Sequence, residues 1–131
     1  LIMLDIDEFK RCNDRCGHQV GDRVLCSLVD HCQKRMRAVD ILGRYGGEEF
    51  VILMPETELK GALIAADRLR IEIQNMQADP SCEDSKITVS VGVASLDTAS
   101  DQAQTIDGWV KAADQALYKA KNSGRNCVRT A

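Results

Sequence analysis

The chain has 131 residues, a length typical of one globular domain. Hydrophobic residues make up 44% of it and charged residues 28%, which excludes a disordered or collagen-like chain. The net charge of −3 and the aromatic content of 4% argue against a protein that binds nucleic-acid polymers through a basic surface or by base stacking. The sequence contains no apolar run long enough to span a bilayer and no recognisable signal peptide.

The chain begins at Leu1, inside an apolar run. We therefore expect one domain over residues 1–131, excised from a longer protein and shortened at its N-terminus. A regulatory domain or a membrane anchor would then lie outside this chain, and the domain itself would make no membrane contact.

Hydrophobic periodicity predicts an ordered series of strands and helices. Strands are expected where apolar residues run together or alternate, and helices where they recur every three or four residues. In chain order the sequence predicts a strand at 1–4, a helix at 20–39, strands at 41–45 and 50–54, a helix at 56–76, a strand at 87–93, a helix at 106–121 and an edge strand at 126–130.

The residues between 45 and 50 predict a β-hairpin. Gly46 and Gly47 stand between two apolar runs, and tight hairpin turns favour glycine because it adopts positive φ without a steric cost. A hairpin makes at least part of the sheet antiparallel, and the sequence has neither a Gly-x-Gly-x-x-Gly motif nor a Walker A loop. These features favour an α+β fold with a central, mainly antiparallel sheet covered by helices.

The six cysteines lack metal-site and disulfide-rich spacing. Most stand at apolar-periodic positions in a chain with an ample core, so we expect reduced thiols in a cytoplasmic protein. Cys12, Cys16 and His18 could form half of a zinc site, but no second ligand pair follows at a suitable spacing.

Two acidic clusters indicate a possible cation site. Asp5, Asp7 and Glu8 follow the first strand, and Glu48 and Glu49 lie at the hairpin. Neighbouring side chains of a strand point to opposite faces, so only one hairpin glutamate can face an aspartate of the first strand. Two such carboxylates and a backbone carbonyl suit Mg²⁺ with triphosphate oxygens. The alternative for each cluster alone is a set of solvated surface charges.

Cations accompany these carboxylates. Lys10 follows the acidic segment, and Lys121 and Arg125 are four residues apart at the end of the last helix. A metal ion with two or three cations is typical of triphosphate chemistry, which depends on positioning and charge neutralisation. The alternative for Lys121 and Arg125 is a common charge complement to a helix C-terminus.

Several ordered segments resemble the GGDEF domain family in its GGEEF variant. They are Asp-Ile-Asp-Glu-Phe-Lys-Arg-Cys-Asn-Asp at 5–14, Gly-His at 17–18, Gly-Asp at 21–22, Arg-Tyr-Gly-Gly-Glu-Glu-Phe at 44–50, Val-Ser-Val-Gly-Val-Ala at 89–94 and the stretch 112–126. The resemblance covers nearly the whole chain. It implies a palm-like fold related to nucleotide cyclases, with a ferredoxin-like core.

The resemblance also implies a diguanylate cyclase, which condenses two GTP into cyclic di-GMP and two pyrophosphates by metal-assisted attack of a ribose 3′-hydroxyl on an α-phosphate. It assigns Asp5, Glu48 and the Ile6 carbonyl to Mg²⁺ or Mn²⁺, and Glu48 is also the candidate base. Glu49 would support the metal. The other implied contacts are guanine at Asn13 and Asp22, substrate at His18, Gly46 and Gly47, the transition state at Lys10, and phosphates at Lys121 and Arg125.

A second implied site is the RxxD motif formed by Arg37 and Asp40, which would bind cyclic di-GMP as an inhibitor with help from Arg68. Its alternative is a simple ion pair at a helix end. A symmetric product from two GTP also requires two nucleotides that face each other, so we expect a catalytic homodimer with twofold symmetry.

Other functions stay open from the sequence. A non-catalytic sensor of cyclic di-GMP or GTP would keep this fold, but such proteins usually lose the hairpin acid, and Glu48 and Glu49 are present. A structural dimerisation domain would leave the acidic cluster unexplained. A cyclase that uses ATP is disfavoured by Asn13 and Asp22. The resemblance also implies a short segment before the first strand, which this chain lacks. Whether the chain folds fully and is active without that segment stays open from the sequence.

Overall fold

The computed structural model of the chain describes residues 1–96 and 105–131. The described elements, in chain order, are β1 (Ile2–Ile6), α1 (Phe9–Cys16), α2 (His18–Arg35), β2 (Ile41–Arg44), β3 (Glu49–Leu53), α3 (Leu59–Asn75), the short 3-10 helix η1 (Glu83–Ser85), β4 (Val89–Val93), α4 (Ile106–Asn122) and β5 (Val128–Thr130). The strands form one sheet in the order β2-β3-β1-β4-β5. Only the β4–β5 pair of this sheet is parallel. The predicted α+β fold with a mainly antiparallel sheet is therefore confirmed.

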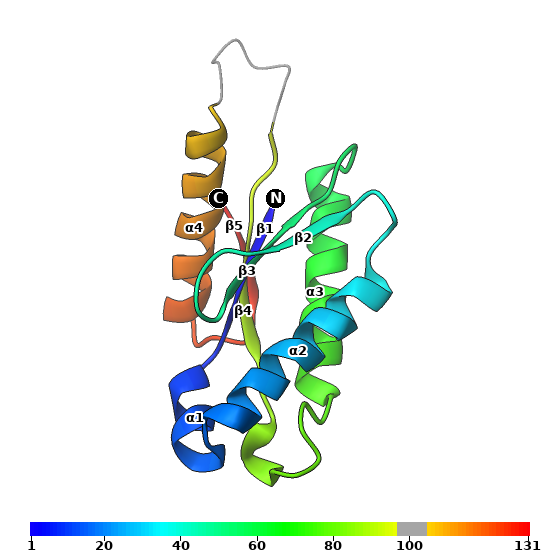
Figure 1. Ribbon diagram of the computed structural model, residues 1–131. Helices are drawn as coiled ribbons and strands as arrows, with labels where there is room; N and C mark the ends of the chain where they lie inside the picture. The colour runs from blue at the N-terminus through cyan, green and yellow to red at the C-terminus, as the bar shows by residue number, and fades with distance from the viewer. Residues whose placement is uncertain (97–104) are drawn as a thin grey trace.

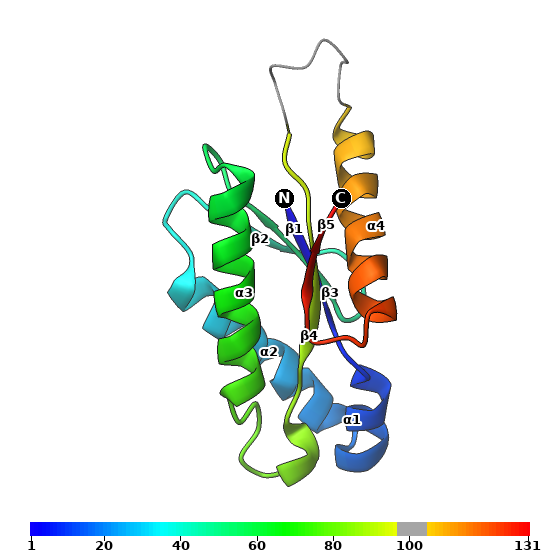
Figure 2. The ribbon, with the colours of Figure 1, turned by 180° about the vertical axis from the view of Figure 1, so that it is seen from behind.

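The central strand β1 faces two different layers. Ile2, Leu4 and Ile6 are buried in a core with residues of α2 and α3, whereas Met3 packs with residues of α4. Figures 1 and 2 accordingly show α3 and α4 on opposite sides of the sheet. Because side chains alternate along a strand, Asp5 shares the α4 face with Met3.

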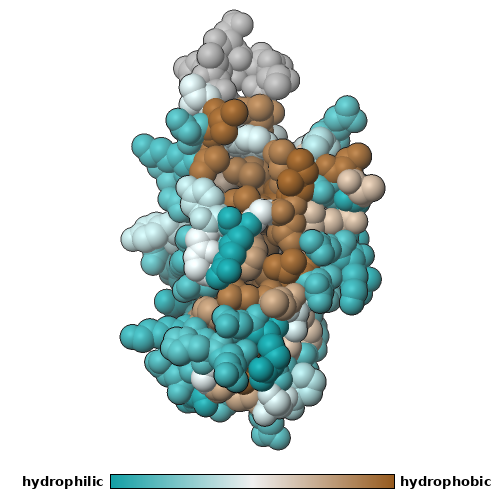
Figure 3. Space-filling model, viewed as in Figure 1, coloured by the Kyte–Doolittle hydropathy of each residue, from teal (hydrophilic) through white to brown (hydrophobic). Residues whose placement is uncertain are grey.

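The α4 face is only partly covered. Half-buried apolar side chains pack around Met3, among them Leu1, Val51 and Trp109. Figure 3 shows hydrophobic residues in a strip along the middle of the viewed face, with hydrophilic residues on both sides of it. The polar end of β1, with Asp5 and the turn after Ile6, adjoins this apolar layer.

The helices differ from the prediction at α1, α2 and α3, and α3 begins at Leu59 instead of residue 56. The sequence analysis predicted no helix at α1, an eight-residue helix in which only Phe9 and Cys12 are buried. The second helix ends at Arg35 instead of residue 39. Beyond its end, the Arg37 amide donates to Asp40 Oδ2 at 2.9 Å and the Asp40 amide donates to the Arg37 carbonyl at 3.0 Å. This local turn competes with further helix.

The hairpin is confirmed, but the reason for its glycines is different. Neither Gly46 nor Gly47 has positive φ. The loop is longer than a two-residue turn, and the Tyr45 amide donates to the Glu49 carbonyl at 2.8 Å. A Cβ at residue 46 would lie 2.7 Å from Glu49 Oε2, so Gly46 leaves room for that carboxylate.

The expectation that all cysteines are reduced is wrong for one pair. Cys16 at the end of α1 and Cys82 beside η1 form a disulfide across 66 residues of sequence. Their Cα atoms lie 6.1 Å apart because the loop that precedes β4 packs against α1. The other four cysteines are free, and burial raises the pKa of the Cys32 thiol to about 12. The zinc half-site is also lost, since Cys16 carries no free thiolate.

Candidate active site

The end of β1 and the β2–β3 turn lie side by side. The Ile6 amide donates to the Glu48 carbonyl at 3.2 Å, and Asp5 pairs with Glu49 in the antiparallel register of β1 and β3. Residues directly opposite each other in such a register have their side chains on the same face. The two acidic clusters of the sequence thus meet at one end of the sheet.

Asp5 is the buried member of this group. Its residue is 6% exposed, and its carboxylate accepts a hydrogen bond from Lys121 Nζ at 2.8 Å. Burial raises the pKa of Asp5, the Lys121 ammonium opposes that rise, and the negative charges of Glu48 and Glu49 add to it. The charges of two hairpin glutamates therefore act on the buried Asp5, and Lys121 is paired directly with it.

Of the three predicted cations, Lys121 is the one that pairs with this group in the described part of the chain. Lys121 lies in the last turn of α4, and the exposed Arg125 lies in the turn that follows it. Lys10 is exposed in α1, which begins three residues after β1 ends. The close approach of α4 to the sheet is possible because Gly92 of β4 has no side chain, since a Cβ there would lie 2.2 Å from the Ala113 carbonyl oxygen.

The residues predicted to bind guanine lie on the α1–α2 hairpin. Asn13 belongs to α1, while His18 and Asp22 are exposed on the first turns of α2. The two helices meet closely at Gly21, which has no side chain. A Cβ on Gly21 would lie only 1.8 Å from Asn13 Oδ1. Gly17, with φ of +85°, forms the bend between the helices.

The carboxylates do not complete a metal site by themselves. Within residues 1–96 and 105–131, no group of three or more His, Cys, Asp or Glu side chains is close enough to hold a metal ion. The predicted ligand set of Asp5, Glu48 and the Ile6 carbonyl therefore needs further oxygen donors from a ligand or from water. A cavity of about 470 Å³ lies beside this set, lined in part by Glu49, Tyr118 and Lys121.

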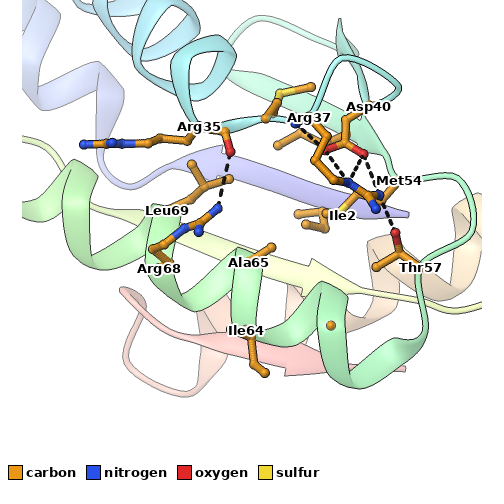
Figure 4. A pocket seen from close by; sticks show the side chains of 13 residues that line it. Ile2, Arg35, Arg37, Asp40, Met54, Thr57, Ile64, Ala65, Arg68 and Leu69 are labelled. Atoms are coloured by element: carbon orange, nitrogen blue, oxygen red, sulfur yellow. Dashed lines mark hydrogen bonds and ion pairs between the residues drawn. The ribbon is translucent and has the colours of Figure 1, made fainter.

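Arg37, Asp40 and Arg68 come together in a separate pocket of about 340 Å³. Ile2 also lines it, so it lies toward the opposite end of β1 from Asp5. Figure 4 shows Arg37 and Asp40 on one side of this pocket and Arg68 on α3 across from them.

Several polar contacts hold Arg37 in this pocket, whereas Arg68 is less constrained. Arg37 Nη2 donates to Asp40 Oδ1 at 2.8 Å, to the Pro55 carbonyl at 3.1 Å and to Thr57 Oγ1. The hydrogen bond with Asp40 raises the pKa of Arg37. Arg68 Nη2 donates only to the Arg35 carbonyl, at 3.3 Å, among the contacts of the described residues.

Two residues organise the active end in a way that the sequence did not predict, although Asp7 was counted in the first acidic cluster. Arg44 donates from Nη2 to the Gly47 carbonyl at 2.7 Å and from Nε to the Gly46 carbonyl at 3.1 Å, so it braces the hairpin turn. Asp7 accepts hydrogen bonds from Thr88, Ser90 and Asn126. Both residues stand inside the recognised motifs, but nothing in their spacing indicates these partners.

Within the described residues, no helix is both long and apolar enough to cross a membrane.

Comparison with known proteins assigns the family. The family model described as "Diguanylate cyclase, GGDEF domain" matches residues 1–127. The chain is 39% identical over 129 residues to the response regulator PleD of Caulobacter vibrioides, covering 97% of this chain and 28% of that protein. It is 40% identical over 131 residues to the diguanylate cyclase DgcM of Escherichia coli, covering 100% of this chain and 30% of that protein. The chain thus spans about a third or less of these relatives.

Solved structures agree with the assignment. The active GGEEF domain of a diguanylate cyclase from Vibrio cholerae has a TM-score of 0.88 at 36% identity, with 98% of this chain and 80% of that chain covered. The coiled coil and GGDEF domain of DgcB from Caulobacter crescentus, in complex with c-di-GMP, has a TM-score of 0.87 at 31% identity, with 99% and 68% covered. With its predicted sheet, its GGEEF hairpin and these similarities in agreement, the chain belongs to the GGDEF domain family.

Proposed function

We propose that this chain is the catalytic domain of a diguanylate cyclase, which converts two GTP into cyclic di-GMP and two pyrophosphates. The observation that carries the proposal is the pairing of β1 with β3, which sets Asp5 opposite Glu49 and within reach of the charge of Glu48, with Lys121 paired to Asp5. Relatives named diguanylate cyclases across nearly the whole chain support the same activity.

The donor set fits a divalent cation. The negative charges of Glu48 and Glu49 lie near the buried Asp5 carboxylate, so bound positive charge at this point would be stabilised. Asp5, Glu48 and the Ile6 carbonyl supply hard oxygen ligands, which Mg²⁺ and Mn²⁺ prefer. When bound, such an ion would neutralise phosphate charge and lower the pKa of a nearby hydroxyl.

The other side chains of the proposed active site have separate roles in nucleotidyl transfer. Lys121 and Arg125 contribute positive charge for the phosphates, and Lys10 stabilises the negative charge of the transition state. The ribose 3′-oxygen forms a bond to the α-phosphorus while the bond from that phosphorus to the pyrophosphate oxygen breaks. Glu48 is the candidate acceptor of the hydroxyl proton, and Glu49 holds additional negative charge near the ion.

Guanine specificity is assigned to the α1–α2 hairpin. An Asp22 carboxylate can accept from the guanine N1–H and 2-amino groups, and the Asn13 amide can both donate and accept. Adenine lacks that pair of donors, so it would leave these polar groups unpaired. His18 adds a substrate contact at the bend, and the backbone of Gly46 and Gly47 allows the nucleotide to approach the hairpin closely.

Turnover on this account needs two copies of the domain. Each copy offers one bound GTP, with one 3′-hydroxyl and one α-phosphate, and the symmetric product requires two such nucleotides face to face. The monomeric site thus catalyses only when a second site is opposed to it.

The pocket with Arg37, Asp40 and Arg68 is proposed to bind cyclic di-GMP and inhibit the enzyme. Arginine presents paired donors that suit guanine acceptors and phosphate oxygens. Among the arginines that line the pocket, Arg37 is held by Asp40 and, within the described residues, Arg68 donates only to a backbone carbonyl, which supports this assignment. The DgcB structures in complex with c-di-GMP show that relatives with this fold bind that nucleotide.

The test uses the chain fused to a two-stranded parallel coiled coil and incubated with GTP and Mg²⁺. Chromatography should detect cyclic di-GMP and pyrophosphate in a 1:2 ratio, and Glu48→Gln should abolish both while the far-UV spectrum is unchanged. Glu58→Gln, an exposed glutamate before α3, is the matched control and should keep full activity. GTP binding without product would indicate a sensor domain, and normal turnover by Glu48→Gln would overturn the assignment of the site.

A further inference from the structure

The turn that follows α4 is held in an unfavourable backbone conformation. Gly124, Arg125 and Asn126 have φ values of +101°, +63° and +44° in succession. Left-handed φ is unfavourable for residues with a side chain, and arginine has no particular preference for it. Such conformations persist where the surroundings determine them, and they are found at ligand-binding positions.

Contacts from both sides determine this turn. The Arg125 amide donates to the Ala120 carbonyl at 3.2 Å, which ties the turn to α4. The Asn126 amide donates to Asp7 Oδ2 at 3.1 Å, and the Asn126 side-chain oxygen accepts from Arg70 Nη1 at 3.1 Å. Arg125, between these anchors, has an exposed side chain.

Asp7 uses its carboxylate as a three-way acceptor. Besides the Asn126 amide, Thr88 Oγ1 donates to Oδ2 at 2.7 Å and Ser90 Oγ donates to Oδ1 at 2.6 Å. The Asp7 amide also donates to the Thr88 carbonyl at 2.9 Å. In the part of the chain that the structure describes, Asp7 forms no ion pair.

We propose that Asp7 is a positioning residue for nucleotidyl transfer, which fixes Arg125 relative to the catalytic carboxylate Asp5. Asp7 stands two residues after Asp5 on the same chain segment, and it binds the amide of the residue that follows Arg125. The end of β1 thereby positions both the Asp5 carboxylate and the Arg125 guanidinium, which is proposed to bind the phosphates. This inference rests on the proposed function, because Arg125 has a role only if a triphosphate binds there.

The chemistry of Asp7 disfavours a role as a further metal ligand. Three donors already occupy most of the lone pairs of its carboxylate. An asparagine at residue 7 can keep the same geometry, with its oxygen toward Asn126 and Thr88 and its amide nitrogen donating to Ser90. A glutamate keeps the charge but moves the carboxylate outward by one methylene. Geometry and charge therefore predict opposite results for these two variants.

Initial rates of cyclic di-GMP formation by the coiled-coil fusion test the proposal. We expect Asp7→Asn to keep kcat within about threefold of wild type, and Asp7→Ala and Asp7→Glu to lower it about tenfold or more, with a smaller change in KM for GTP. Asp79→Ala is the control for general destabilisation, because Asp79 is a buried aspartate that also accepts three hydrogen bonds, from Arg23 and twice from Ser81. It should lower the melting temperature and leave kcat unchanged.

A double-mutant cycle tests whether Asp7 acts through Arg125. Arg125→Ala alone should lower kcat about 10²-fold, as for loss of one charge-stabilising donor. The double variant with Asp7→Ala should stay within about twofold of Arg125→Ala, because the residue that Asp7 positions is already gone. Multiplication of the two single losses would overturn the proposal, and so would activity in Asp7→Glu together with inactivity in Asp7→Asn.

Amide hydrogen exchange gives a readout that does not need turnover. Exchange at the Asn126 amide should accelerate in Asp7→Ala and stay slow in Asp7→Asn, and unchanged exchange in Asp7→Ala overturns the proposal. Measurements on the wild-type fusion show whether a negative result refutes only the role of Asp7 or also the proposed function. A wild type that neither binds nor converts GTP refutes the function and with it the role of Asp7, whereas an active wild type with a multiplicative cycle refutes only the latter.

Discussion

Gly92 in β4 provides a direct way to move the phosphate-binding end of α4. A Cβ at residue 92 would lie 2.2 Å from the Ala113 carbonyl oxygen, 2.3 Å from the Leu117 amide nitrogen and 2.9 Å from the Ala116 carbonyl carbon. All three are backbone atoms, so no side-chain rotation can relieve the contact. For Gly92→Ala, α4 has to withdraw from the sheet by about 1 Å to reach ordinary van der Waals separation.

Two effects of known size follow from that displacement. Overpacking of a well-packed core costs about 1–3 kcal/mol, which at about 4 °C per kcal/mol lowers the melting temperature by about 4–12 °C. The same movement carries Lys121 away from Asp5, with which it forms a 2.8 Å ion pair. A misplacement of about 1 Å in a catalytic group costs about 10²-fold in rate, so we expect kcat to fall by that order.

Thermal unfolding followed by circular dichroism and initial rates of cyclic di-GMP formation measure the two effects. Gly43→Ala is the matched control, because a Cβ there meets only Val51 Cγ2 at 3.4 Å, an ordinary contact. It should change the melting temperature and the rate little. Wild-type stability and rate in Gly92→Ala, or equal losses in both variants, would refute the reasoning.

Three further predictions concern other parts of the molecule. Arg37→Ala should raise the concentration of cyclic di-GMP that halves the initial rate by about 10–100-fold, as for loss of charge-assisted hydrogen bonds, and an unchanged value would remove the inhibitory pocket. Cys82→Ser removes the disulfide, so its free energy of unfolding in urea should be about 4 kcal/mol lower than that of the oxidised wild type. Equal free energies of unfolding for the variant and the oxidised wild type would contradict the disulfide. Hydrogen bonds from Ser81, and to a smaller extent from Arg23, lower the pKa of Asp79 to about 2, from 3.8 in the unfolded chain. The ionised carboxylate therefore stabilises the folded state at pH values above 3.8, and this stabilisation is lost as the pH falls toward 2. The stability deficit of Asp79→Asn at pH 7 should therefore shrink as the pH falls from 5 toward 2, and a deficit independent of pH would contradict this.

Much of the sheet could be predicted because its signals are local. The alternation of Val89, Val91 and Val93 with small or polar residues marks a strand, and the apolar runs on both sides of Gly46 mark a hairpin. A hairpin next to a short buried strand leaves few ways to assemble a sheet. The register within that sheet could not be predicted: the sequence left open which hairpin glutamate faces Asp5, and the structure sets Glu49 directly opposite it.

The parts that escaped prediction depend on a disulfide and on polar contacts between residues distant in sequence. The disulfide spans 66 residues, and the hydrogen bond between Asn126 and Asp7 spans 119. Such contacts leave no periodic trace in a sequence, because any polar residue at an element's end has the same local pattern. The α1 helix escaped for a different reason, because it has only eight residues, of which Phe9 and Cys12 are buried.

The ion pair between Lys121 and Asp5 is a further case. The sequence placed Lys121 among the phosphate contacts by resemblance, and the structure pairs it with the buried carboxylate. Helix-end lysines are usually solvated, so this partner depends on the close packing of α4 at Gly92. A triphosphate that binds Lys121 would have to compete with Asp5 for it.

Binding of Mn²⁺, measured by electron paramagnetic resonance in the presence of a non-hydrolysable GTP analogue, tests most directly whether the end of β1 and the hairpin share one cation. We expect a tight Mn²⁺ site in the wild type that Asp5→Asn and Glu48→Gln each weaken by at least about tenfold, with the double variant little worse than either. Unchanged Mn²⁺ affinity in either single variant would contradict a cation held jointly by these two segments.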